Sequence, residues 1–328
     1  MKSVPMLSAA AGIIVLWSVA VAAAPAAPAA KQPDTSYGRN YHELTLTSKK
    51  GRHYRIQVSV PDAAAPKEGY PVLYVLDGNG WFEPAAGIMR MREYEKLSPT
   101  IVVGVAAANK SFFDNSRAYD FTPPGSVEPE FEGIPIGGGD EFLAFLDDTV
   151  KPWVSAHYRT DPHRRILFGH SMGGSFALHA LFKSPGSFDV YLAASPDIGF
   201  GAEIVPKEEP AFESDPRRKL PRLLVTVGSL EQGPSPALED DYRRWYAAHP
   251  EEIPGMTPDQ AVAELFSDGD NYDKIGKTRA LVEKLKQSGV AAEFVEFDGD
   301  EHMAAAISAL NRGVPFALRP PASGTSPN

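Results

Sequence analysis

The stretch RILFGHSMGGSFAL, residues 165–178, decides how the rest of the sequence is interpreted. Its centre, GHSMG, matches the pattern G-x-S-x-G, in which a sharp turn between a strand and a helix exposes a serine hydroxyl. The apolar run 165–168 predicts a buried strand, and the apolar spacing over 173–183 predicts a helix directly after the serine. The glycines that flank the serine leave room for such a crowded turn. We therefore interpret Ser171 as a candidate nucleophile.

The same alternation of strand and helix runs through most of the chain. Short apolar runs rich in β-branched and aromatic residues predict strands, and apolar residues at three- and four-residue spacings predict helices. The further strands are expected over 42–47, 54–60, 71–76, 100–105, 190–194, 223–227 and 292–297, and the further helices over 83–95, 140–157, 277–287 and 303–318. This order predicts an α/β fold: a mostly parallel, twisted sheet with helices on both faces, and an edge hairpin formed by the first two strands.

Three segments, 111–139, 199–221 and 232–272, interrupt this alternation and are rich in proline, glycine or charged residues. In an open α/β sheet, the loops at the carboxyl ends of the strands build the ligand pocket. We therefore expect these segments to be loop insertions over the active site and the source of its specificity.

Composition excludes several classes of protein. A chain of 328 residues with 43% hydrophobic content suits one α/β domain with insertions. The formal charge of −10 and the lack of a Lys/Arg-rich run argue against nucleic acid as a partner. The absence of cysteine excludes disulfides, thiol nucleophiles and cysteine metal sites. We expect no cofactor and no metal.

The N-terminal residues 1–30 have the form of an export signal: a lysine near the start, an apolar run, and then small residues. We expect a signal peptide over 1–24, an Ala/Pro linker over 25–36, a single domain over 37–320 and a disordered tail over 321–328. An uncleaved anchor is the alternative, because the apolar run approaches the length of a membrane-spanning helix. In both cases the remainder is expected to be periplasmic or secreted.

The candidates for a general base are the histidines that follow Ser171. His179 lies on the expected helix after the serine and His249 lies in a charged insertion, whereas His302 falls in the turn FDGDEHM between the last strand and the last helix. That turn supplies the base in the chain order serine, acid, histidine. For the acid we prefer Glu231, in the loop VGSLEQG after the penultimate strand. Other candidates for the acid are Asp197, Asp270, Asp273, Asp300 and Glu301.

In this mechanism His302 takes the proton of Ser171 as the hydroxyl attacks an ester carbonyl, and then returns it to the leaving alcohol. The resulting oxyanion needs two donors. One is expected to be the backbone N–H of Met172, and the other to come from the loop DGNGWF, where Asn79 is preferred over the alternative of a simple tight turn. Trp81 in that loop could stack on an aromatic acyl group or pack in the pocket wall.

Over about residues 40–318 the sequence resembles the putative-esterase branch of the α/β-hydrolases, which includes esterase D-like enzymes and enterobactin-type siderophore esterases. The stretches that carry the likeness are YPVLYVLDGNGWF, RAYDFTPP, FLAFLDDTVKPWVSAHYRTDPHRRILFGHSMGGSFALHALFKSPGSFDVYLAASP, LLVTVGSLEQ and VEFDGDEHMAAAISAL. The resemblance implies an α/β-hydrolase fold and hydrolysis of carboxylic esters. For exported members it suggests the trilactone backbone of a catecholate siderophore as substrate.

The resemblance also assigns roles to individual residues. Ser171, His302 and Glu231 match the nucleophile, the base and the carboxylate of the family, although some exported members are thought to use a Ser-His dyad. Arg117 matches a family arginine near the site, which meets a substrate charge or ties down its own loop.

Our leading hypothesis is therefore an exported serine esterase that forms an acyl-enzyme with a small-molecule ester. An acyltransferase or peptidase on the same fold is the first alternative, because the same catalytic groups serve those reactions. A non-catalytic binding protein is the second. The sequence leaves the natural ester and the oligomeric state open.

Overall fold

The computed structural model describes residues 40–126, 133–198, 207–215, 218–233, 236–265 and 273–319. The expected signal peptide, the Ala/Pro linker, the C-terminal tail and Asp270 lie outside the described residues. Within the described part of the chain, no helix combines the length and the apolar character needed to cross a membrane.

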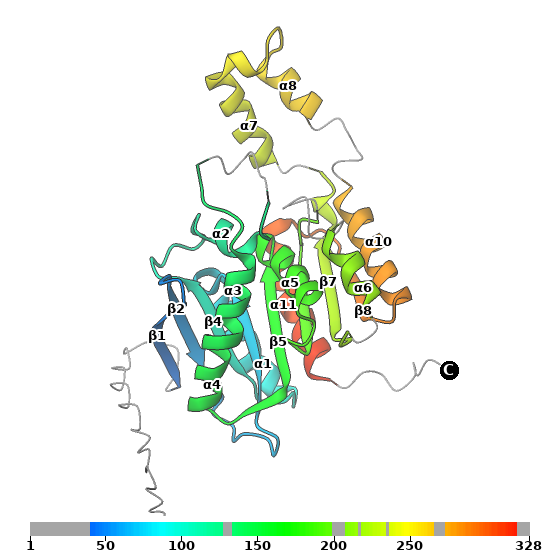
Figure 1. The fold of residues 1–328 in the computed structure, drawn as a ribbon. Coiled ribbons are helices and arrows are strands. Elements are labelled where there is room, and N and C mark those ends of the chain that lie inside the picture. Colours follow the sequence, from blue (N-terminus) through cyan, green and yellow to red (C-terminus); the bar gives the residue numbers. More distant parts are fainter. Residues whose placement is uncertain are drawn as a thin grey trace, which may run out of the picture. The chain divides into compact units, whose positions relative to one another are not determined.

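The described chain builds one 8-stranded sheet with the strand order β1-β2-β4-β3-β5-β6-β7-β8 (Figure 1). Its strands are β1 Tyr41–Thr47, β2 His53–Ser59, β3 Tyr70–Leu76, β4 Ile101–Ala107, β5 Thr160–His170, β6 Val190–Ala194, β7 Arg222–Gly228 and β8 Ala291–Phe297. The pairs β1/β2 and β2/β4 are antiparallel and the other neighbours are parallel. The mostly parallel sheet and its edge hairpin are thus confirmed.

Helices cover both faces of the sheet (Figure 1). Those that pack on it are α1 Gly78–Tyr94, α3 Gly139–Phe145, α4 Lys151–His157, α5 Met172–Lys183, α10 Lys274–Gln287 and α11 His302–Leu318. A five-residue π-helical segment, Leu146–Val150, joins α3 to α4, so the expected helix over 140–157 is nearly continuous.

Two hydrophobic clusters, one on each face, hold the layers together. Tyr74 of β3 packs with Phe142 and Phe176 in the cluster under α3, α4, α5 and α10. The next residue, Val75, packs in the other cluster, with Leu310 and the rest of the apolar faces of α1 and α11. This alternation explains why the central strands are continuous apolar runs: both of their faces are buried.

The expected loop insertions contain helices of their own, which corrects the sequence prediction. These are α2 Arg117–Phe121, α6 Glu209–Ser214, α7 Pro236–Ala248 and α8 Pro258–Leu265. Proline stands at the first position of α7 and of α8, where its missing N–H costs no hydrogen bond. The proline-dotted composition therefore indicated helix starts as well as turns.

Candidate active site

Ser171 stands in a strained turn between β5 and α5. Its backbone adopts φ 58° and ψ −124°, and α5 begins at the next residue, Met172. A Cβ atom on Gly169 would lie 1.9 Å from the carbonyl oxygen of Gly173, so the turn closes only with glycine there. The predicted strand–serine–helix geometry is present, and this strain is typical of a nucleophile elbow.

The Ser171 hydroxyl is left available by this turn. The backbone of Ser171 is fixed, because its N–H donates to the Ala194 carbonyl at 3.0 Å and its carbonyl accepts from the Ser175 N–H at 2.9 Å. Within the described part of the chain, the hydroxyl itself makes no hydrogen bond, and the residue is partly exposed. An incoming substrate therefore meets a serine with a rigid backbone and an uncommitted side chain.

His302 and Glu231 come together at the same edge of the sheet. His302 is the first residue of α11, after β8, and Glu231 ends a short 3₁₀ turn after β7. The His302 Nδ1 atom lies 2.6 Å from Oε2 of Glu231. A carboxylate only accepts, so Nδ1 carries the proton and Nε2 remains free to accept one.

Glu231 is held in its charged form by several donors. Its side chain is only 4% exposed. Its Oε1 atom accepts from the Ser195 hydroxyl at 2.6 Å and from the Gly228 N–H at 2.7 Å. Burial acts to raise the pKa of Glu231, but hydrogen bonds and charge from His302, Lys274 and Ser195 outweigh it and hold that pKa well below its ordinary value.

The rival carboxylates in the described chain have other positions. Asp273 is the N-cap of α10, where it accepts from the Gly276 N–H at 2.9 Å. Asp300 and Glu301 precede His302 directly, and no hydrogen bond joins either carboxylate to its ring among the described residues. The backbone N–H of Asp197 donates to Ser175 Oγ at 3.0 Å. Of these carboxylates, Glu231 is the one that meets His302 at hydrogen-bond distance.

Two further residues lie beside His302 and Glu231, and neither was predicted from the sequence. His170 is buried, its ring centroid lies 4.5 Å from that of His302, and its Nε2–H donates to the His302 carbonyl at 2.8 Å. Burial lowers the pKa of His170 to about 3, so this ring is neutral. Lys274 donates from Nζ to Glu231 Oε2 at 2.6 Å. The position of His170 inside GHSMG was a signal for it, whereas Lys274 has no local signal.

The residues expected to form the oxyanion hole follow two neighbouring strands, β5 and β3. Parallel pairing sets Val75 of β3 opposite Phe168 of β5, so the residues after both strands are neighbours. Met172 begins α5, and the first N–H groups of a helix have no partner within it. Asn79 lies in the first turn of α1, and its side chain is committed to the Ala107 carbonyl at 3.0 Å and to Arg55 at 2.8 Å. Its backbone N–H is therefore the group available as a donor.

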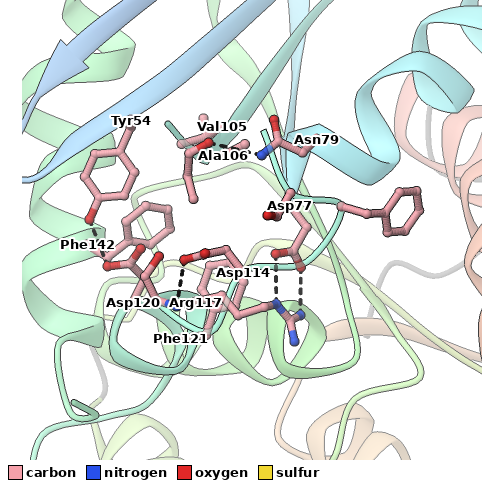
Figure 2. A pocket seen from close by; sticks show the side chains of 14 residues that line it. Tyr54, Asp77, Asn79, Val105, Ala106, Asp114, Arg117, Asp120, Phe121 and Phe142 are labelled. Atoms are coloured by element: carbon pink, nitrogen blue, oxygen red, sulfur yellow. Dashed lines mark hydrogen bonds and ion pairs between the residues drawn. The ribbon is translucent and has the colours of Figure 1, made fainter. Parts of the chain in front are cut away.

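Arg117 braces the loop beside the elbow. Its Nε and Nη2 atoms donate to the two carboxylate oxygens of Asp77 at 2.9 and 2.7 Å (Figure 2). Its third nitrogen, Nη1, lies 3.1 Å from the sulfur of Met172. Because the guanidinium is used in a bidentate pair, the arrangement agrees with the alternative in which this arginine ties down its loop.

A cavity is lined by Asp77 and Arg117 together with the polar groups of Tyr54 and Asp120 (Figure 2). There the Tyr54 hydroxyl donates to Asp120 at 2.8 Å. Burial raises the pKa of Asp120 to about 6, although the charge of Arg52 acts against it. The cavity thus holds a carboxylate that changes charge near neutral pH.

Trp81 does not occupy the position expected for a substrate contact. It is only 3% exposed, and its ring packs against His170 at a centroid distance of 5.2 Å. Phe112 and Phe113 contact its ring at 5.7 and 6.0 Å and are 51% and 39% exposed. The burial corrects the prediction: Trp81 packs in the wall, and the two phenylalanines present the aromatic surface.

The fold and this site define the class of the protein. An eight-stranded, mostly parallel sheet with a serine at the turn after a central strand, followed by an acid and a histidine after later strands, is an α/β-hydrolase. The family model described as "Putative esterase" matches residues 47–222. The chain belongs to this family and is a carboxylic ester hydrolase.

Curated proteins and solved structures with similar sequences carry related names. The chain is 29% identical over 289 residues to the ferri-bacillibactin esterase BesA of Bacillus subtilis (strain 168), covering 84% of this chain and 89% of that protein. It is 38% identical over 220 residues to the siderophore enterobactin esterase of Emericella nidulans, covering 60% and 71%. The siderophore hydrolase EstA from Aspergillus nidulans matches with a TM-score of 0.69 at 30% identity, covering 87% and 96%.

Proposed function

We propose that the protein is an exported serine esterase that hydrolyses the ester bonds of a siderophore trilactone. The observation that carries the proposed mechanism is the 2.6 Å hydrogen bond between His302 and Glu231, at the sheet edge where Ser171 stands in its strained turn. The curated relatives named for ferri-bacillibactin and enterobactin support the proposed substrate class.

Each group in the site has a role in the proposed reaction. His302 accepts the Ser171 proton through Nε2 while the hydroxyl oxygen attacks the ester carbonyl, and Glu231 stabilises the imidazolium that forms. The backbone N–H groups of Met172 and Asn79 stabilise the oxyanion. His302 then protonates the leaving alcohol, and water releases the acid from Ser171 by the same steps in reverse.

The surface formed by Phe112 and Phe113 suits an aromatic acyl group. Phe112 and Phe113 form an exposed edge-to-face pair with ring centroids 4.7 Å apart. The Arg117 guanidinium lies over the Phe113 ring at 5.1 Å. An aryl ester placed on this pair meets apolar ring surface, which fits the aromatic ring of a catecholate.

The proposal can be tested by comparing the wild type with Ser171→Ala. Two kinds of substrate are used: a catecholate trilactone, with and without Fe³⁺, and p-nitrophenyl esters of increasing acyl length. We expect kcat/KM to be larger for the trilactone by orders of magnitude, and both reactions to be lost in the variant. Equal turnover by the two proteins would exclude the serine mechanism. A trilactone that reacts no faster than the p-nitrophenyl esters would exclude the substrate class.

The proposed export rests on the sequence of residues 1–30. Expression of the full chain with its own N-terminus, followed by mass spectrometry of the protein recovered outside the cytoplasm, tests it. We expect removal of residues 1–24. An intact chain in the membrane fraction would indicate the anchor, and an intact chain in the cytoplasm would exclude export.

A further inference from the structure

Lys274 lies beside both Glu231 and His302. Its Nζ atom lies 2.6 Å from Glu231 Oε2, the same oxygen that accepts from His302 Nδ1. The distance between Lys274 Nζ and His302 Nδ1 is 3.5 Å. Both atoms are donors toward the shared oxygen, so this close approach brings two proton-bearing nitrogens together. The carboxylate that is proposed to stabilise the imidazolium is therefore shared with the Lys274 ammonium.

The lysine is held in this position from both sides. The residue before it, Asp273, accepts from the Gln232 side-chain amide at 2.7 Å, and the N–H of the residue after it, Ile275, donates to Gln232 Oε1 at 3.2 Å. Gln232 directly follows Glu231 in the chain. The first turn of α10 is thereby fixed to the segment that carries the acid, and the Lys274 side chain is only 21% exposed.

We propose that Lys274 is a positioning residue that fixes the Glu231 carboxylate and, through its charge, disfavours the imidazolium of His302. The inference rests on the proposed role of His302 as the base. A cation at 3.5 Å from a ring nitrogen raises the energy of the charged ring, and it acts against the carboxylate that both groups share.

The other groups that face His302 do not supply this charge. His170 packs against the ring and is neutral, because burial lowers its pKa to about 3. Asp300 and Glu301, on the turn before His302, are acidic and would act in the opposite direction. Among the residues that the structure describes around this ring, Lys274 is thus the cation whose removal changes its electrostatics most.

The test follows the ring of His302 directly and does not depend on ester hydrolysis. Protein labelled with ¹³C and ¹⁵N in histidine is titrated by NMR, with His302→Gln to assign the signal. We expect Lys274→Met to move the titration midpoint of His302 upward by about one pH unit. Lys274→Arg, which keeps the charge, should restore the wild-type midpoint. The matched control is Lys277→Met, which removes an exposed lysine from the same helix.

The acid limb of the kcat/KM profile with a neutral p-nitrophenyl ester should move upward by the same amount, with KM unchanged. A midpoint unchanged in Lys274→Met, or an equal shift in Lys277→Met, would overturn the proposal and leave Lys274 as a purely structural partner of Glu231. If Lys274→Met does not fold, Lys274→Gln takes its place, because its amide still donates to Glu231. A shifted ring without esterase activity would refute the proposed function and keep the inference.

Discussion

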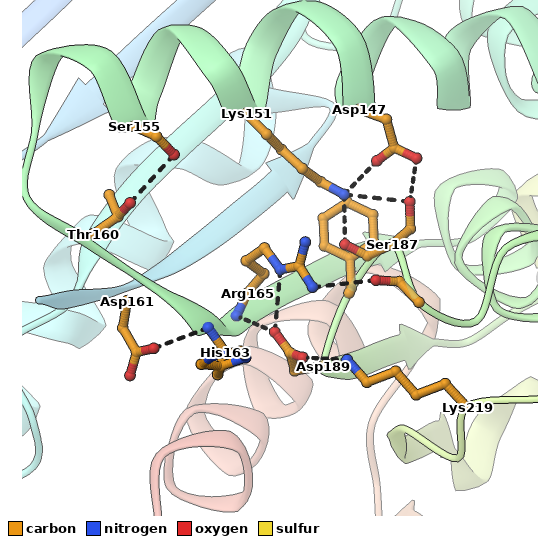
Figure 3. Close-up of polar contacts among 12 residues, drawn as sticks. Asp147, Lys151, Ser155, Thr160, Asp161, His163, Arg165, Ser187, Asp189 and Lys219 are labelled. Carbon is orange, nitrogen blue, oxygen red and sulfur yellow. Dashed lines mark hydrogen bonds and ion pairs between the residues drawn. The ribbon is translucent and has the colours of Figure 1, made fainter. Parts of the chain in front are cut away.

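Two clusters at opposite edges of the sheet contain the same kinds of groups and differ in what they can do. At the carboxyl edge, the serine, the basic group and the carboxylate are Ser171, His302 and Glu231. At the amino edge they are Ser187, Lys151 and Asp147 (Figure 3). The Lys151 ammonium contacts Asp147, the Ser187 carbonyl at 2.5 Å and the Ser187 hydroxyl at 3.3 Å.

The amino-edge serine is bound in a way that prevents attack on a substrate. The Ser187 hydroxyl donates directly to Asp147, and the residue is 5% exposed. Burial lowers the pKa of Lys151 to about 8, with Asp147 acting against that shift. Ser171, by contrast, is partly exposed at the start of a helix, with an uncommitted hydroxyl. Exposure, backbone strain and a position at the start of a helix thus distinguish Ser171 from Ser187, which is buried and hydrogen-bonded to Asp147.

Removing the hydroxyl of Ser171 or of Ser187 should give the largest difference in activity between variants of the two clusters. We expect Ser171→Ala to lower kcat/KM for p-nitrophenyl esters by about 10⁴-fold or more, because no other group can form the acyl-enzyme. Ser187→Ala should keep activity within about twofold and lower the free energy of unfolding by about 1–2 kcal/mol through its lost hydrogen bonds. Steady-state kinetics and urea denaturation measure both. Loss of activity in Ser187→Ala, with its fold intact, would contradict a purely structural role for Ser187.

Neutralising Glu231 or Asp147 should give the next largest difference in kcat between the two clusters. Glu231→Gln should lower kcat by about 10²- to 10⁴-fold with little change in KM, because the amide cannot stabilise the imidazolium and favours the wrong ring tautomer. Asp147→Asn, at the amino edge, should leave kcat unchanged. The same ester assay reports both values. An unaffected kcat in Glu231→Gln would point to a Ser-His dyad.

A smaller effect on kcat is expected from a substitution that displaces the turn before His302. A Cβ atom on Gly228 would lie 2.2 Å from the Asp300 carbonyl oxygen, on the turn that carries His302. Gly228→Ala should therefore displace the base and lower kcat by about 10- to 100-fold. Gly186→Ala is the control at the amino edge, where a Cβ atom meets nothing within 4 Å. Equal kcat in the two variants would show that the turn adjusts without moving the ring.

The smallest expected effect is on the free energy of unfolding alone. Because the pKa of Lys151 in the folded protein is about 8, against 10.5 as its ordinary value, the unfolded chain binds more protons between these pH values. The contribution of Lys151 to the free energy of unfolding therefore rises with pH over this window, by up to about 3 kcal/mol. Lys151→Met lacks the titration, so the difference between the two proteins should grow in favour of the wild type. Denaturation at about pH 7.5 and about pH 10 measures it, and a constant difference would contradict the depressed pKa.

The sheet could be predicted from the sequence because burial on both faces produces continuous apolar runs. The runs at 71–76, 100–105 and 223–227 lie within one or two residues of β3, β4 and β7. Chain order was enough to propose Ser171, His302 and Glu231 as candidates, since residues after parallel strands share one edge. The structure brings the last two into contact.

The remaining parts depend on contacts that no local pattern carries. Lys274 reaches Glu231 across 43 positions of chain, so neither residue's neighbours in the sequence indicate the pair. The exposure of Trp81 depends on Phe112 and Phe113, which come from a different segment and cover it. The helices α7 and α8 are short and charged, and their composition resembles that of a loop.

The positive φ of Ser171 lowers the stability of the folded protein. A non-glycine residue held at φ 58° costs of order 1–3 kcal/mol, and glycine adopts that conformation without the penalty. The most stable residue at this position is therefore one that has no hydroxyl. Under the proposed mechanism, a search for thermostable variants that does not also assay hydrolysis would select glycine at this position and lose the activity.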